Sequence, residues 1–204
     1  MKPPRVILAS ASPARLTTLR QAGLDPDVIV SGVDEDALSA PDPTRLVALL
    51  ARAKAEAVAA GRPEDGVLII GCDSLLEFDG DVYGKPASAA QAVERWRRMR
   101  GAAGVLRTGH HVIARLGGAE HSLTRVASTT VHFAELSDDE IDAYVATGEP
   151  EQVAGAFTID GLGGAYVRSL SGDPHAVVGI SLPLLREMLA ELGVTWHHLW
   201  RPPA

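Results

Sequence analysis

Short apolar runs that favour strands alternate along this chain with longer segments that carry helix start and stop signals. The predicted strands cover residues 5–9, 27–31, 67–72, 105–116 and 122–133. The predicted helices cover residues 13–22, 44–60, 88–99, 137–147 and 182–192. The alternation favours parallel strands, and the two long strands joined at Gly117-Gly118 favour an antiparallel pair. We therefore expect an α/β fold with a mixed, twisted sheet flanked by helices.

Composition and charge narrow the class of protein. Hydrophobic residues make up 46% of the chain and no stretch has the composition of a linker, so we expect residues 1–204 to form a single domain. The net charge of −7 argues against binding a nucleic acid polymer, although a few local cations would suffice for a small polyphosphate. The single cysteine, Cys72, suits a reducing compartment, and the apolar run near the N-terminus is too short for a signal peptide or a membrane span. A cytoplasmic protein that does not enter the membrane is expected.

The most informative segment surrounds Asp73. A β-branched run at residues 67–70 predicts a buried strand, and Gly71 is expected to end it, so that Asp73 stands where strand gives way to irregular chain. The turn dipeptide Asp79-Gly80 predicts a hairpin that returns Lys85 towards Asp73. A carboxylate and an ammonium facing one cleft suit a metal-bound phosphate substrate. The alternative is a surface Asp and Lys that flank an ordinary hairpin.

The same hairpin has a superficial likeness to a phosphate-binding P-loop. It has three residues between Gly80 and Gly84, where that loop needs four. Pro86 replaces the metal-binding Ser or Thr and has no N–H to donate to a phosphate. A P-loop ATPase is therefore rejected.

The first helix also offers an anion site. Ser12 is placed to cap it and Pro13 fits its first position, so free N–H groups would face a ligand. Arg15, on the first turn, could add a charge-assisted contact to a phosphate. The alternative is a plain capped helix.

Two further elements carry charges. Asp34, Glu35 and Asp36 follow one another and could share a divalent cation, but such runs are more often solvated loops. Lys54 lies on an alanine-rich helix, where an exposed lysine is ordinary.

Three glycines interrupt the segment from 158 to 170, which we expect to be a loop with short strands. Gly161, Gly163 and Gly164 would permit close approach of the backbone to a ligand, and Asp160 just before them could read the ligand's donor groups. The alternative is a flexible loop with a turn-forming aspartate.

Together these elements resemble the Maf family of nucleoside triphosphate pyrophosphatases, also called septum-formation inhibitors, over essentially the whole chain. The matching elements are Ser10 to Arg15, Val33-Asp34-Glu35, Lys54, Cys72-Asp73-Ser74, Gly84-Lys85-Pro86, Thr108-Gly109, Gly148-Glu149-Pro150, Ala154 to Phe157 and Val178 to Pro183.

The resemblance implies an elongated, two-lobed architecture like that of inosine triphosphatases, with a central cleft, and hydrolysis of a nucleoside triphosphate to the monophosphate and pyrophosphate. It also implies a divalent cation, Mg²⁺ or Mn²⁺, and leaves a homodimer open. One alternative is a triphosphate hydrolase of another type that releases orthophosphate. Another is a nucleotide-binding regulator of cell division without significant turnover.

The family's functional residues fall on definite positions of this chain. The resemblance assigns catalysis to Asp73 and Lys85, and the metal to Glu35 and Asp73. It assigns substrate binding to Ser10, Ser12, Arg15, Lys54 and Asp160.

Three positions depart from the common family pattern. Ala14 replaces an arginine, Ser74 replaces a threonine and Asp160 replaces a glutamine. Base specificity is therefore not implied by the resemblance.

Overall fold

The computed structural model describes residues 3–201 and contains one seven-stranded sheet. Its strands are β1 (Arg5–Leu8), β2 (Asp27–Val28), β3 (Val67–Phe78), β4 (Asp81–Tyr83), β5 (Ala103–Leu116), β6 (Ala119–Phe133) and β7 (Val167–Ser171). Their order is β2-β1-β3-β5-β6-β7, and β4 pairs with β3. Because β1 pairs in parallel with β2 and β3 while the β3–β4 and β6–β7 pairs are antiparallel, the prediction of a mixed α/β sheet is confirmed.

Within residues 3–201, six α-helices accompany the sheet. They are α1 (Pro13–Gln21), α2 (Pro43–Ala60), α3 (Ala89–Met99), α4 (Asp138–Ala146), α5 (Pro174–Val178) and α6 (Leu182–Glu191). The side chain of Ser12 caps α1, with Pro13 in the first turn, as predicted. Ser137 and Glu140 form a complete capping box at the start of α4. The short helix α5 has no counterpart among the predicted elements. No helix within residues 3–201 is long and apolar enough to cross a bilayer.

The chain divides into two compact units, which we describe separately. The first comprises residues 1–73, 108–127 and 179–204, and the second comprises residues 74–107 and 128–178. The expectations of a single domain, an elongated shape and a central cleft remain predictions.

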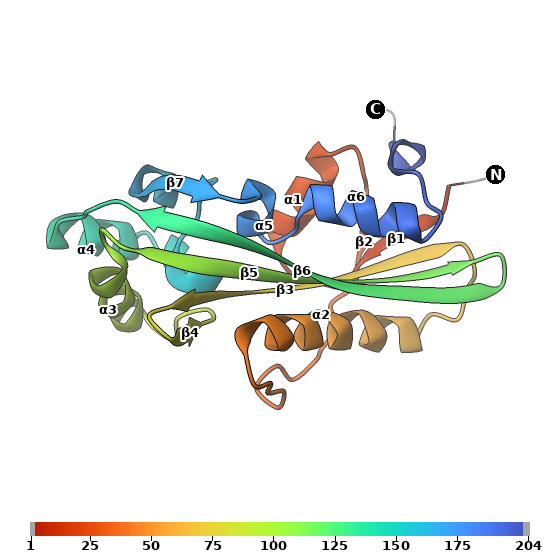
Figure 1. The fold of residues 1–204 in the computed structure, drawn as a ribbon, viewed down its shortest axis with the longest axis horizontal. Helices are drawn as coiled ribbons and strands as arrows, with labels where there is room; N and C mark the ends of the chain where they lie inside the picture. Colours follow the sequence, from red (N-terminus) through yellow and green to blue (C-terminus); the bar gives the residue numbers. More distant parts are fainter. Residues whose placement is uncertain (1–2, 202–204) are drawn as a thin grey trace. The chain divides into compact units, whose positions relative to one another are not determined.

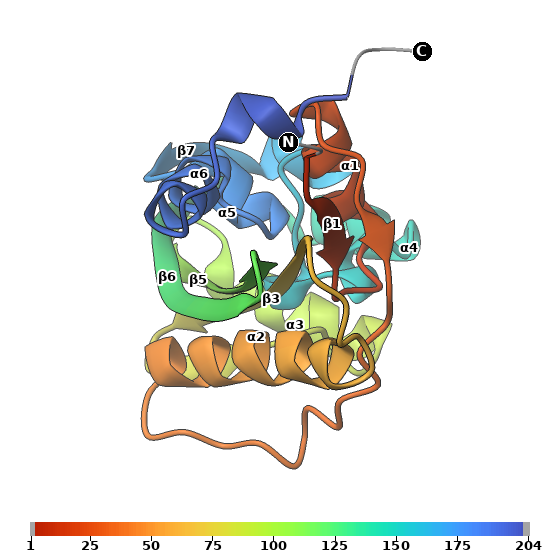
Figure 2. The same cartoon turned by 90° about the vertical axis from the view of Figure 1, so that its right-hand side faces the viewer.

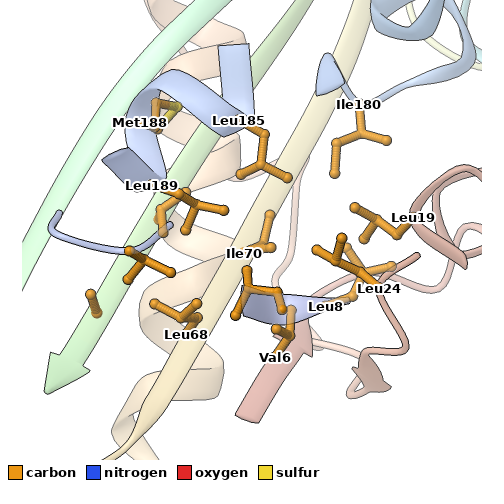
Figure 3. Packing of buried hydrophobic residues seen from close by; sticks show 14 of the residues in the cluster. Val6, Leu8, Leu19, Leu24, Leu68, Ile70, Ile180, Leu185, Met188 and Leu189 are labelled. Carbon is orange, nitrogen blue, oxygen red and sulfur yellow. The ribbon is translucent and has the colours of Figure 1, made fainter. Parts of the chain in front are cut away.

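In the first unit, helices cover both faces of the sheet. Helices α1 and α6 lie over one face and α2 lies over the other (Figures 1 and 2). Successive residues of a strand point to opposite faces, so β1 contributes Val6 and Leu8 to the core beneath α1 and α6, and Ile7 to the core beneath α2. Figure 3 shows the first of these cores, where Leu185, Met188 and Leu189 of α6 face the strands. Burial on both faces explains why the strands read as continuous apolar runs.

The predicted end of the third strand at Gly71 is wrong. Strand β3 continues through Gly71 to Phe78, so Asp73 lies inside a strand rather than at its end. A Cβ at Gly71 would lie 2.2 Å from the carbonyl oxygen of Ala51 and 2.9 Å from the backbone nitrogen of Ala55, both on α2. Gly71 therefore marks a close approach of helix to strand and not a break in the strand.

The second unit packs around Trp96 of α3. Its indole is fully buried and makes edge-to-face contacts with Phe133 and Tyr144, and its N–H donates to the carbonyl of Ala156 at 2.7 Å. The predicted hairpin at Asp79-Gly80 is confirmed, because β3 and β4 pair there.

Two other predicted segments also differ from the structure in their bounds or their content. The second predicted strand, residues 27–31, shortens to Asp27–Val28. The predicted loop at residues 158–170 contains a 3-10 helix at Leu162–Tyr166 and most of β7. Pairing with β6 extends β7 to Ser171, a tertiary contact that local sequence does not reveal.

Candidate active site

A buried ammonium held between two carboxylates forms the centre of the site. Nζ of Lys54 on α2 lies 2.6 Å from Oδ1 of Asp73 on β3 and 2.8 Å from Oε1 of Glu35. The side chains of Lys54 and Asp73 are only 10% and 9% exposed, whereas that of Glu35 is 52% exposed. The fold thus brings together Glu35, Lys54 and Asp73, which lie in separate elements of the sequence. Lys54, which alone reads as an ordinary surface lysine, is buried beside its partners.

Two glycines allow this contact. Gly71 on β3 and Gly109 on β5 each face the backbone of α2, and a Cβ at Gly109 would lie 2.1 Å from the carbonyl oxygen of Val47. Without side chains at these positions, the helix can lie close against both strands. Lys54 lies on α2, near the backbone that touches Gly71. The short distance between α2 and β3 therefore lets the side chain of Lys54 contact Asp73.

Burial raises the pKa of Asp73 above its ordinary value. The positive charges of Lys54 and Arg15 and the hydrogen bond from Lys54 oppose this effect, whereas the charge of Glu35 adds to it. A carboxylate with a raised pKa is a better proton acceptor than an exposed one, which suits a general base. Burial also raises the pKa of the neighbouring Cys72 thiol to about 12, so Cys72 stays a neutral apolar side chain.

The N-terminus of α1 contributes a second group of polar side chains to the same unit. Arg15 is buried, and its guanidinium donates to Oγ of Ser10 at 3.0 Å and to the carbonyl oxygen of Gly179 at 2.8 Å. Ser12 accepts from the backbone N–H of Arg15 at 3.4 Å. Because the charge of Arg15 acts on Asp73, this end of α1 forms part of the same electrostatic environment.

His110 on β5 joins this part of the first unit, although the sequence motifs did not single it out. It is fully buried on β5, and its Nε2 accepts from the backbone N–H of Ser181 at 2.8 Å. Ser181 caps α6, and Arg15 holds Gly179 two residues earlier. His110 and Arg15 therefore fix one turn from two sides. Gly179 and Ser181 lie in the element 178–183, which carried a family resemblance without a role, and His110 directly follows the matching element Thr108-Gly109.

Lys85 and Asp160 belong to the second unit, and both are exposed. Lys85 follows Gly84, whose carbonyl accepts from Nη1 of Arg95 at 2.7 Å and from the N–H of Gly155 at 3.1 Å. The backbone just before Lys85 is therefore fixed. That Lys85 and Asp160 lie close to Asp73 stays a prediction.

A divalent cation fits the donor set of the first unit. Within residues 3–201 there is no group of three or more His, Cys, Asp or Glu side chains close enough to hold an ion, so the arrangement in which Asp34, Glu35 and Asp36 share one cation is not seen. Mg²⁺, however, is usually held by one or two carboxylates together with waters and substrate phosphates. Glu35 and Asp73, which approach the same ammonium, supply two.

Known proteins match this chain over nearly its whole length. The chain is 57% identical to the nucleoside triphosphate pyrophosphatase of Salinispora tropica over 97% of this chain and 88% of that protein. It is 55% identical to the protein of the same name from Streptomyces avermitilis, and 52% identical to that from Cutibacterium acnes, each over 97% of this chain and 95% of the relative. The family described as Maf-like protein matches residues 5–192. This chain belongs to the Maf family.

Proposed function

We propose that this protein hydrolyses nucleoside triphosphates to the monophosphate and pyrophosphate. The observation that carries the proposal is the buried Lys54–Asp73 pair with Glu35 and Arg15 beside it. The relatives that are 52–57% identical over nearly the whole chain are named nucleoside triphosphate pyrophosphatases, which supports the same activity.

In the proposed reaction, Asp73 orients a water molecule and accepts its proton as the water oxygen bonds to the α-phosphorus. The bond from that phosphorus to the bridging oxygen breaks, and the electron pair leaves with pyrophosphate. Lys54 and Lys85 bind the phosphates and offset the charge that develops on them. Ser10, Ser12 and Arg15 line the phosphate end of the site, with the N-terminus of α1 facing the anion.

We further propose that Glu35 and Asp73 hold Mg²⁺ or Mn²⁺. A bound divalent ion would supply electrostatic stabilisation of the triphosphate oxygens. Removal of non-standard or excess nucleotides is the role that such a reaction would serve. Since the only cysteine is buried and unpaired, we expect the protein to work in the cytoplasm. The homodimer that the resemblance leaves open stays an expectation.

The test is a product-resolved screen of common and modified nucleoside triphosphates with Mg²⁺ or Mn²⁺, run on the parent protein and on Asp73→Asn. The variant keeps the shape of the side chain but removes its charge and basicity. We expect pyrophosphate as the product and a fall in turnover of at least ~100-fold in the variant.

Asp79→Asn is the matched control, because it removes the same charge from a side chain that is 81% exposed on the following hairpin. Its turnover should stay close to that of the parent. Orthophosphate as the first product, or an Asp73→Asn variant within a few-fold of the parent, would contradict the proposal. Tight binding of nucleotide by the parent without any turnover would favour the regulatory alternative.

A further inference from the structure

Glu149 gathers an unusual number of hydrogen-bond donors in the second unit. Its Oε1 accepts from the hydroxyl groups of Tyr144 at 2.9 Å and Thr158 at 2.6 Å, and from the N–H of Gly163 at 2.9 Å. Its Oε2 accepts from the N–H of Leu162 at 3.0 Å. Three of these four donors lie in the segment 158–163, which carries Asp160. One carboxylate therefore ties both sides of that segment to the end of α4 and the 3-10 helix at Glu149–Gln152.

The glycines of the segment complete this arrangement. A Cβ at Gly161 would lie 2.6 Å from Oε2 of Glu149, and a Cβ at Gly163 would lie 2.2 Å from the hydroxyl of Tyr144. The backbone thus closes around the carboxylate at a distance that only glycine allows. Gly161 and Gly163 thus provide close packing around the carboxylate, and the alternative of a flexible loop is what the exchange experiment below tests.

The chemistry of the four contacts requires a carboxylate. An ionised carboxylate only accepts hydrogen bonds, and every group that faces Glu149 here donates one. A glutamine at this position would have to turn its NH₂ towards either the N–H of Leu162 or the three donors at Oε1. Burial by itself raises the pKa of Glu149, but the bonds from Thr158, Gly163, Leu162 and Tyr144 outweigh it and leave the pKa lowered.

We propose that Glu149 is a positioning residue that holds the 158–163 segment, and with it Asp160, in the conformation that receives the nucleotide. The inference rests on the proposed function for the identity of the ligand. A glycine-rich segment without such an anchor would be ordered only when the nucleotide binds, and the entropy of that ordering would be subtracted from the affinity. Glu149 acts through the segment rather than by touching the reacting atoms.

The test compares Glu149→Gln with Glu151→Gln in the full-length protein. Glu151 lies in the same 3-10 helix, and its side chain makes no hydrogen bond or ion pair within residues 3–201, so it controls for the same chemical change. We expect Glu149→Gln to speed amide hydrogen exchange at Leu162 and Gly163. We also expect it to raise KM by about tenfold with a smaller change in kcat, and to reduce the preference among bases. Glu151→Gln should match the parent in all three respects.

Thr158→Val provides a second, milder variant should Glu149→Gln fold poorly. It removes one donor to the carboxylate and keeps the shape of the side chain. The proposal predicts the same changes in smaller size, and a double variant whose KM is raised by less than the product of the two single effects. Unchanged exchange at Leu162 and Gly163 would overturn the anchor. Faster exchange with KM and base preference unchanged would overturn its role at the nucleotide.

The hydrogen-exchange measurement separates this inference from the proposed function. If the parent shows no pyrophosphate release, the proposed function fails, and exchange with and without bound nucleotide still tests the anchor. If the parent is active and Glu149→Gln is indistinguishable from it, only the role of Glu149 fails.

Discussion

Replacing Gly71 by alanine should disturb the candidate site without touching any of its charged groups. The new Cβ would lie 2.2 Å from the carbonyl oxygen of Ala51, where ordinary contacts begin at 3.4 Å. The clash is with backbone, so no side-chain rotation can relieve it, and α2 must move away from β3 by about 1 Å. Lys54 moves with the helix, and its 2.6 Å contact with Asp73 would pass out of hydrogen-bond range.

The size of the effect follows from two general magnitudes. Overpacking a core costs about 1–3 kcal/mol, and each kcal/mol lowers Tm by about 2–4 °C in a chain of this length, so we expect a fall of about 2–12 °C. A misplacement of about 1 Å at a reacting group costs up to about 100-fold in rate, so kcat/KM should fall ~10- to 100-fold.

The assay measures Tm by calorimetry and kcat/KM by pyrophosphate release. Gly61→Ala is the matched control at the C-terminal cap of the same helix, because Gly61 has a φ of −89° and the nearest heavy atom to a Cβ there would lie 3.9 Å away. It should leave both quantities near those of the parent. Gly109→Ala, with a 2.1 Å clash against Val47, should behave like Gly71→Ala. If Gly71→Ala kept the Tm and kcat/KM of the parent, the reasoning that close helix approach sets the Lys54–Asp73 contact would be refuted.

Three further predictions concern the substrate and the second unit. Lys85→Ala should lower kcat/KM by a similar factor for every nucleotide, since the phosphates are common to all; a loss confined to one base would contradict phosphate binding. If Asp160 faces the base, its carboxylate accepts from the N1–H and amino group of guanine, so GTP and 7-methyl-GTP should be turned over in preference to UTP and dTTP. Asp160→Gln should shift the preference towards the pyrimidines, and an unchanged ranking would exclude this role. Because the pKa of Glu149 is lowered by folding, its stabilising effect is present above its ordinary value of 4.5 and lost as pH falls through the folded value. The difference in free energy of unfolding between parent and Glu149→Gln should therefore shrink below about pH 4.5, and a pH-independent difference would argue against the charge.

Local sequence signals determined the longer helices and most of the strands, but not the short helix α5. The cap at Ser12, the turn at Asp79-Gly80 and the apolar runs depend on neighbouring residues alone, and the structure confirms each of them. The family could also be inferred from the order of motifs along the chain, and the comparisons confirm it.

Only the tertiary structure decided what the glycines and the isolated charges do. Gly71 reads as a strand end because glycine is a poor strand residue, yet it lies inside β3 because α2 packs against it. Lys54 reads as a surface lysine because nothing near it in sequence carries a partner, and its partners arrive from Asp73, 19 residues away, and from Glu35. Glu149 lies five residues from Tyr144 but up to 14 from its other donors. Contacts of this kind depend on how elements pack, and the local preferences that a sequence reveals contain no information about which distant group will fill a given position.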